Sequence, residues 1–162
     1  MRDKLISLTE VSNIEEIGDK FLDYCLENNF EMIEKIDAIL PDHKRDWFQK
    51  IYQYYLADRE EKKQDFTPPS LGILIDKLSG EDMSVIDLCS GSGSLMIQSW
   101  NENPKREFRC YELDKKVIPF LLMNAVIRNM KASIVHGDVL KEEIFKTYTL
   151  EPTETGYAKT TV

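Results

Sequence analysis

Residues 84–94 read Ser-Val-Ile-Asp-Leu-Cys-Ser-Gly-Ser-Gly-Ser and are the most informative stretch for the fold class. The short apolar run at 84–88 is typical of a buried strand, and the glycines at 91 and 93 interrupt it. The apolar spacing of residues 95–101 then indicates a helix. This order of strand, glycine turn and helix is typical of an open α/β sheet, where ligands bind at the carboxyl ends of the strands.

The flanking sequence repeats the alternation of strands and helices. A helix is expected at 71–78, before the first strand, and a second strand at 107–111 follows the first turn and helix. A helix at 115–129 and a third strand at 132–135 come next. Short links between alternating strands and helices predict a parallel sheet with right-handed crossovers.

Acidic residues stand at three successive strand ends. Asp87 precedes the glycine turn, Glu112 lies 25 residues after Asp87, and Asp138 ends the third strand. An acid about 20 residues beyond such a turn binds ribose hydroxyls in nucleotide sites. A further carboxylate accepts a hydrogen bond from an exocyclic amine such as that of adenine. The three strand ends together predict a pocket for an adenosine group.

The glycine spacing bears on which cofactor this pocket takes. A dinucleotide fingerprint has a third glycine where this chain has Met96, so a nicotinamide-dependent oxidoreductase is the weaker alternative. A Gly-x-Gly turn that opens a helix for purely structural reasons is the other alternative, and the strand-end acids Glu112 and Asp138 count against it.

The first sixty residues have a different pattern. Apolar residues recur at helical spacing over 12–29, 30–40 and 47–56, and Ser12 with Glu15 forms a capping-box pattern. A run of charged and amide residues from 58 to 65 indicates a linker. We therefore expect an N-terminal α-helical segment at 1–63 and a ligand-binding α/β domain at 64–162.

Charge, cysteine content and hydropathy bear on whether the protein binds nucleic acid, holds a metal or disulfides, or spans a membrane. The formal net charge is −8, so any surface for nucleic acid must be a local basic patch, for which Lys105, Arg106, Arg109, Lys115 and Lys116 are candidates. Three widely spaced cysteines favour neither a disulfide framework nor a metal cluster, which indicates a cytoplasmic protein without a metal. No apolar run is long enough to predict a membrane span.

Four motifs resemble the adenine-N6 DNA methyltransferases, especially the modification subunits of type I restriction systems and short phage or mobile-element relatives. Residues 66–69, Phe-Thr-Pro-Pro, are similar to the segment that covers the methionine end of S-adenosylmethionine, and 87–95 are similar to the first cofactor motif. Residues 111–114, Tyr-Glu-Leu-Asp, and 136–138, His-Gly-Asp, match the ribose-binding and adenine-binding acids. The resemblance covers about half of the chain.

This resemblance implies a Rossmann-like class I methyltransferase sheet, S-adenosyl-L-methionine as cofactor and DNA as a partner. It also implies that the cofactor contacts are Phe66, Thr67, Pro68, Asp87, Cys89, Gly91, Gly93, Glu112, Leu113 and Asp138.

One family motif has no counterpart. These methylases hold the flipped-out adenine with an Asn/Asp-Pro-Pro-Tyr/Phe motif after the fourth strand, and no such motif follows Asp138. Asn103-Pro104 is interpreted as a turn. The catalytic residues are therefore unassigned. The alternative function is a non-catalytic module with the methyltransferase fold, which acts as an accessory subunit or as an acidic inhibitor of a DNA-binding machine.

The expected sheet is incomplete, with few parallel strands, so the first strand has an exposed edge. The tail, with β-forming residues at 146–150 and 157–162, is expected to pair there as a hairpin. A homodimer or a partner subunit is the other way to cover this edge.

Overall fold

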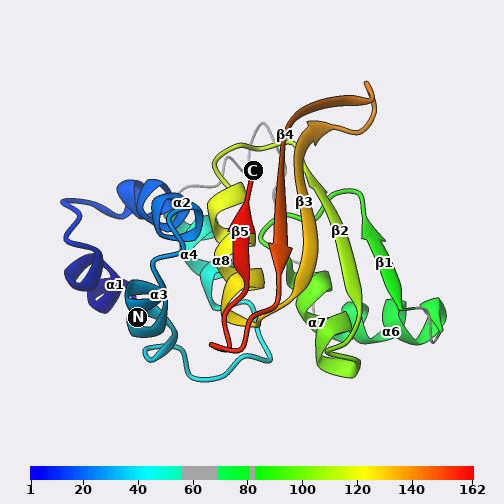
Figure 1. Ribbon diagram of the computed structural model, residues 1–162, viewed down its shortest axis with the longest axis horizontal. Helices are drawn as coiled ribbons and strands as arrows, with labels where there is room; N and C mark the ends of the chain where they lie inside the picture. Colours follow the sequence, from blue (N-terminus) through cyan, green and yellow to red (C-terminus); the bar gives the residue numbers. More distant parts are fainter. Residues whose placement is uncertain (56–68, 81–82) are drawn as a thin grey trace.

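The computed structural model describes residues 1–55, 69–80 and 83–162 (Figure 1). The N-terminal part contains α1 (Arg2–Thr9), the short 3-10 helix η1 (Ile14–Glu16), α2 (Ile17–Leu26), α3 (Phe30–Asp37) and α4 (Trp47–Tyr55). The remainder contains α6 (Pro69–Ser79), β1 (Ser84–Asp87), α7 (Ser94–Glu102), β2 (Glu107–Glu112), α8 (Ile118–Ile127), β3 (Lys131–Asp138), β4 (Glu143–Glu151) and β5 (Lys159–Thr161).

The strands form one sheet in the order β1-β2-β3-β4-β5. Strands β1, β2 and β3 are parallel and are connected through α7 and α8, so the predicted alternation of parallel strands and helices is confirmed. Asp87 pairs with Cys110 and Glu112 pairs with His136, so the carboxyl ends of these strands lie along the same edge of the sheet. Strands β4 and β5 run antiparallel, which makes the sheet mixed.

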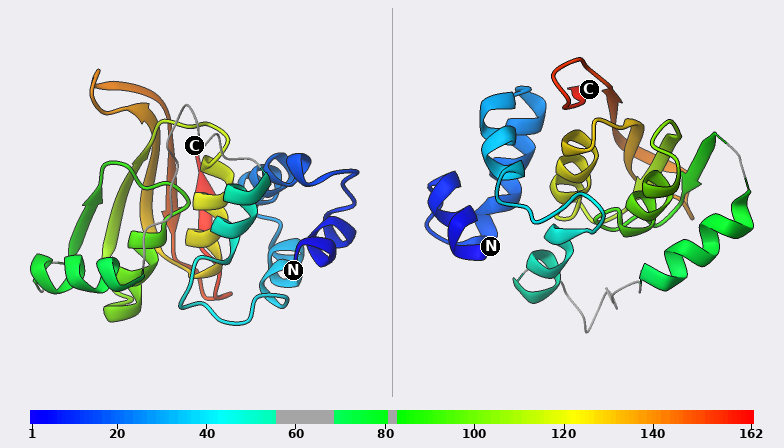
Figure 2. Two further views of the ribbon diagram at one scale, coloured as in Figure 1. Left: turned by 180° about the vertical axis from the view of Figure 1, so that it is seen from behind. Right: turned by 90° about the horizontal axis from the view of Figure 1, so that it is seen from below.

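Helices α7 and α8 lie on one face of the sheet (Figure 2). The burial of β2 alternates accordingly, because Phe108 and Cys110 are buried against the helices while Glu107 and Arg109 are exposed on the opposite face. No helix in the described ranges covers that opposite face (Figure 2). The core of the α/β part is therefore built on one side of the sheet.

The N-terminal helices join this core through α8. Phe21 of α2 contacts the rings of Phe48 on α4 and Phe120 on α8, with ring centroids 5.0 Å and 5.6 Å apart. Helix α8 lies between the sheet and the N-terminal helices, and all of its residues from Ile118 to Ile127 are buried. This position explains why α8 is apolar on nearly all sides, with Asn124 as its one polar residue. The helical segment and the sheet therefore share one hydrophobic core.

Two local predictions for the N-terminal segment need correction. Helix α1 was not predicted, so the described part before residue 56 has four α-helices where three were expected. The predicted Ser12–Glu15 capping box is displaced by one residue, because the Asn13 side chain accepts from the backbone N–H groups of Glu15 and Glu16. The expected linker near residue 63 lies outside the described residues.

The prediction for the tail was right about the hairpin and wrong about its position. Strand β4 pairs with β3, and β5 pairs with β4, so the hairpin extends the edge opposite β1. Tyr148 and Leu150 of β4 pair with Ile134 and Ala132 and are buried against the helices. This burial of apolar side chains favours pairing of the hairpin with β3. In the described part of the chain, no strand pairs with the second edge of β1.

Candidate functional site at the strand ends

The glycine turn after β1 has the backbone that its sequence predicts. Gly91 and Gly93 have φ angles of 54° and 96°, a region that residues with a side chain rarely adopt. A Cβ atom at Gly93 would lie 2.8 Å from side-chain atoms of Leu121 and Met96, so this position also lacks space. A Cβ atom at Gly91 would meet no atom within 4 Å. The turn is therefore packed against α8 at Gly93 and open at Gly91.

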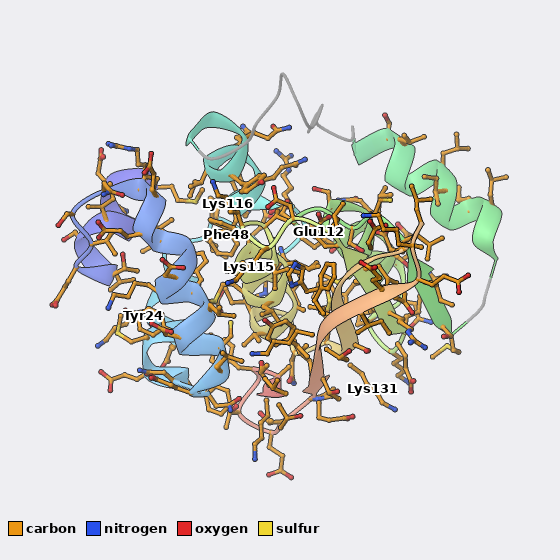
Figure 3. All side chains as sticks on the ribbon, turned by 90° about the horizontal axis from the view of Figure 1, so that it is seen from above. Tyr24, Phe48, Glu112, Lys115, Lys116 and Lys131 are labelled. Atoms are coloured by element: carbon orange, nitrogen blue, oxygen red, sulfur yellow. The ribbon has the colours of Figure 1, made fainter. Side chains whose placement is uncertain are left out.

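The turn is bonded to the end of β2. The Gly91 N–H donates to Oε2 of Glu112 at 2.8 Å, and the Ser90 N–H donates to the Tyr111 carbonyl at 2.9 Å. The other carboxylate oxygen of Glu112 accepts from the Asp114 N–H at 2.7 Å. Each oxygen thus has a backbone donor and keeps further acceptor capacity. Figure 3 shows Glu112 near the end of β2, together with Lys115 and Lys116 of the loop that leads to α8.

Asp87 ends β1 beneath this turn. Its Oδ1 accepts from the Cys89 N–H at 3.2 Å, while its Oδ2 is buried and has no hydrogen-bond partner. Burial raises the pKa of both the Asp87 and Glu112 carboxyl groups, and hydrogen bonds from backbone N–H groups oppose that rise. A buried carboxylate oxygen without a donor costs free energy, so Asp87 is a candidate to bind a ligand.

The raised pKa of Asp87 predicts how the Asp87→Asn variant depends on pH. A carboxyl group with a raised pKa in the folded state stabilises the fold most below its unfolded pKa, about 3.9, and this contribution is lost as the pH rises through the folded pKa. Asparagine does not titrate. We therefore expect the free energy of unfolding of Asp87→Asn, relative to wild type, to increase as the pH rises from about 4 through the raised pKa of Asp87.

Urea denaturation at several pH values measures this difference. The matched control for the loss of a carboxylate is Asp19→Asn, at an exposed position on α2. A free-energy difference for Asp87→Asn that stays constant across the pH range would contradict the expectation.

Asp138 stands at the end of β3, two residues beyond the residue that pairs with Glu112. Its Oδ1 accepts from the backbone N–H groups of Leu140 and Lys141 at 3.0 Å and 3.2 Å, and its Oδ2 lies 3.3 Å from Lys141 Nζ. Asp138 therefore lies on the same edge of the sheet as Glu112. Its side chain, however, is bonded to the turn between β3 and β4.

The other predicted contacts differ in their surroundings. Leu113 follows Glu112 and is 57% exposed, so an apolar side chain stands free beside the carboxylate. Cys89 is exposed in the turn. The predicted contacts Phe66, Thr67 and Pro68 lie outside the described residues.

The five residues predicted to form a basic patch do not lie on a single surface. Arg106 is buried, and its guanidinium donates to Ser99 Oγ at 2.8 Å and to the Gly80 carbonyl at 2.9 Å. Lys105 precedes β2 whereas Lys115 and Lys116 follow it, so these exposed lysines lie at opposite ends of the strand. The interpretation of Asn103-Pro104 as a turn is confirmed, because Asn103 Oδ1 accepts from the Lys105 N–H.

Several polar residues that support the site were missed by sequence reasoning. Asp46, before α4, accepts hydrogen bonds from Ser92 in the turn and from Asn124 on α8. Tyr52 on α4 donates to Asp114 Oδ2 at 2.9 Å, next to Glu112. The apolar spacing of α4 and α8 predicted helices, and it contained no signal that their polar side chains meet at the turn.

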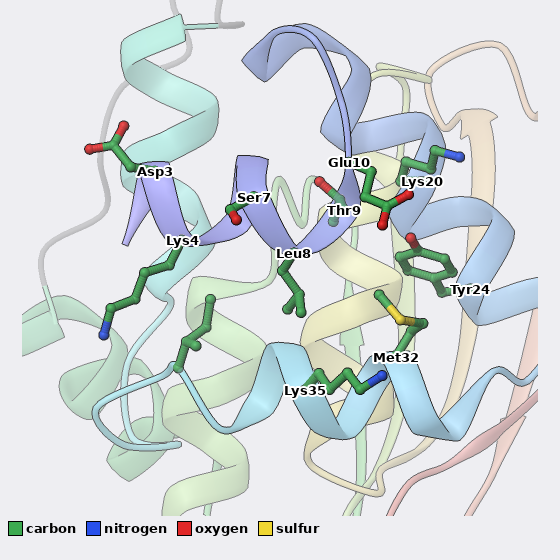
Figure 4. Close-up of a pocket in the computed structure, with 11 residues that line it drawn as sticks. Asp3, Lys4, Ser7, Leu8, Thr9, Glu10, Lys20, Tyr24, Met32 and Lys35 are labelled. Carbon is green, nitrogen blue, oxygen red and sulfur yellow. The ribbon is translucent and has the colours of Figure 1, made fainter.

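In the described part of the chain, one cavity lies next to the end of β1 and another lies among the N-terminal helices. A cavity of about 410 Å³ adjoins Asp87 and is lined by residues of α6, β1 and α7, including Gly72, Ile75 and Leu95. A cavity of about 1000 Å³ lies between α1, α2 and α3, with Lys4, Lys20 and Lys35 on its walls (Figure 4). None of the predicted site residues lines the larger cavity.

The fold and the strand-end residues define an α/β protein with a mixed sheet and a glycine turn bonded to an acidic residue of the adjacent strand. The chain belongs to the N-6 DNA Methylase family, whose model matches residues 43–155, more than two thirds of the sequence. The match begins within the loop before α4 and ends before β5, so it includes both Asp46 and the strand ends. Neither the curated proteins nor the solved structures gave a match to the chain.

No helix in the described residues has the length and apolar character to cross a membrane. Within the same residues, no group of three or more His, Cys, Asp or Glu side chains is arranged to hold a metal ion.

Proposed function

We propose that the chain binds S-adenosylmethionine at the carboxyl ends of β1, β2 and β3, as an S-adenosylmethionine-dependent methyltransferase-like protein that acts on adenine N6 in DNA. The main support for this proposal is the hydrogen bond that the Gly91 N–H donates to Glu112. It places an open glycine backbone and a carboxylate with spare acceptor capacity side by side, as a ribose with two hydroxyl groups requires.

Three observations test whether the residues fit this cofactor. The space beside Gly91 is open, so backbone and ligand can approach closely. Leu113 presents a free apolar surface next to Glu112, suited to one face of an adenine ring. The Asp87 carboxyl group lines the cavity next to β1, where it is suited to a cationic group. The chemistry of these groups matches the ribose, the adenine and the methionine ammonium of the cofactor.

The bound cofactor supplies an electrophilic methyl group for in-line transfer to an amine. In this proposal the chain orients the cofactor, with Glu112 on the ribose and Asp138 on the adenine amine. Holding two reactants in line lowers the entropic part of the barrier. No described residue is assigned to the target base.

We propose, too, that a second copy or a partner subunit covers the free edge of β1. Exposed apolar side chains flank this edge, among them Leu74 and Leu78 of α6 and Ile86 of β1. An exposed, apolar strand edge is a template for pairing with another chain. Light scattering on the purified chain distinguishes a dimer from a monomer that needs a different partner.

The net charge of −8 and the dispersed lysines favour a second candidate function, a non-catalytic module with this fold that acts through protein contacts. A methyl-transfer assay on unmethylated DNA with labelled S-adenosylmethionine separates the two. Incorporation by the wild-type chain, abolished in Glu112→Ala, supports the methyltransferase. Cofactor binding without any incorporation supports the non-catalytic module.

A further inference from the structure

The segment between α3 and α4 contacts the glycine turn and both helices that follow the first two strands. We call residues 43–46 the clamp segment. The His43 and Arg45 carbonyls accept from the Arg128 guanidinium of α8, each at 2.8 Å. The Lys44 carbonyl accepts from the side chains of Gln98 and Asn101 on α7. Three successive carbonyls of the clamp segment are therefore bonded to side chains of α7 and α8.

Asp46 completes the clamp segment with its side chain. Its Oδ2 accepts from the hydroxyl groups of Ser92 at 2.5 Å and Ser94 at 3.1 Å, both in or next to the glycine turn. Its Oδ1 accepts from Asn124 Nδ2 at 2.9 Å and from the Phe48 and Gln49 N–H groups at the start of α4. One carboxylate oxygen thus caps α4, while the other is bonded to the turn.

Ser92 is held on its backbone as well as its side chain. Asn124 Nδ2 donates to the Ser92 carbonyl at 2.9 Å, in addition to its bond with Asp46. Arg128 in turn donates to the Asn124 side-chain oxygen at 2.9 Å. Ser92, Asn124 and Arg128 are all buried, so these bonds are shielded from water.

This network bears on the adjacent residues Gly91 and Gly93. Glycines lose more conformational freedom than other residues when they become ordered, and a ligand that orders a loose turn loses affinity in proportion. Ser92 lies between the two glycines, so the bond that its hydroxyl donates to Asp46 restrains both. The Gly91 N–H then stays directed at Glu112.

We propose that Asp46 and Ser92 are positioning residues, through which the clamp segment fixes the glycine turn in its ligand-binding conformation. The proposal rests on the proposed function, because its consequence for cofactor affinity requires the cofactor to bind at this turn. It extends that function by assigning a role to Asp46, which precedes the α/β part, and to the Ser92 hydroxyl that is bonded to it.

Ser92→Ala tests the proposal with little disturbance, because it removes one hydroxyl and leaves Asp46 to cap α4. The matched control is Ser99→Ala on α7, since Ser99 is equally buried and its hydroxyl is also bonded to a charged group, Arg106. Two measurements are made on each protein. They are the hydrogen-exchange rates of the backbone amides at 90–94 and the affinity for S-adenosylhomocysteine by calorimetry.

We expect Ser92→Ala to raise the exchange rates of the turn and to weaken S-adenosylhomocysteine binding, each by roughly tenfold, as for a lost bond to a charged group. Ser99→Ala should keep wild-type values for both measurements, although its melting temperature should fall about as much as that of Ser92→Ala. Unchanged exchange in Ser92→Ala, or an equal increase in Ser99→Ala, overturns the proposal.

The two readouts keep this proposal distinct from the proposed function. If the wild-type chain binds no S-adenosylhomocysteine, the proposed function fails, and the exchange rates alone then decide whether the clamp segment restrains the turn. If the wild-type chain binds and Ser92→Ala binds equally well, the positioning role is overturned even where exchange is faster.

Discussion

Replacing Glu112 by alanine should weaken the binding of S-adenosylhomocysteine about 100-fold. The change removes the acceptor proposed for two ribose hydroxyls, and hydrogen bonds to charged groups contribute about 1.5–3 kcal/mol each. It also removes the acceptor of the Gly91 N–H, so the turn loses its bond to β2. Isothermal titration calorimetry on folded protein measures the loss.

Glu107→Ala is the matched control for this prediction. Glu107 is an acid on the same strand, but it lies at the opposite end and pairs with Lys131 on the surface. The affinity of Glu107→Ala should equal that of wild type. Equal affinities for Glu112→Ala and wild type would remove Glu112 from the site.

Phe21→Ala should lower the free energy of unfolding by about 3–5 kcal/mol, the usual cost of truncating a buried aromatic side chain. Phe21 is fully buried and its ring contacts Phe48 and Phe120, so the cavity would open where α2, α4 and α8 meet. Because the helical segment and the sheet share this core, we expect the whole chain to unfold in one transition.

Chemical denaturation followed by circular dichroism and by tryptophan fluorescence measures both quantities. The control is Phe145→Ala, a phenylalanine of β4 that is 54% exposed and for which we expect a change below about 1 kcal/mol. Two separate transitions, of which Phe21→Ala shifts only one, would show that the N-terminal helices and the sheet fold independently.

The parallel part of the fold was predictable because its signals are local. The apolar run that ends at Asp87 and the glycines that follow it specify a strand, a turn and a helix without reference to distant residues. The edge at which the tail hairpin joins the sheet is a long-range choice. Strand propensity marked residues 146–150 as β-forming, but only the packing of Tyr148 and Leu150 against the helices selects β3.

In the candidate site, too, the residues with local signals were predictable and those that depend on long-range packing were not. The strand-end rule placed Asp87, Glu112 and Asp138 along one edge, and the structure has them there. The role of Asp46 could not be predicted, since an aspartate just before a helix is typical of an ordinary N-cap. Its second carboxylate oxygen reaches Ser92 only because α4 packs beside α8, which no local pattern encodes.

A crystal structure of the chain with S-adenosylhomocysteine tests the central proposal most directly. We expect the ligand at the carboxyl ends of β1, β2 and β3, with its ribose hydroxyls on the Glu112 carboxylate and its adenine beside Leu113 and Asp138. Ligand density in the cavity between α1, α2 and α3 instead, with the strand ends empty, would contradict it.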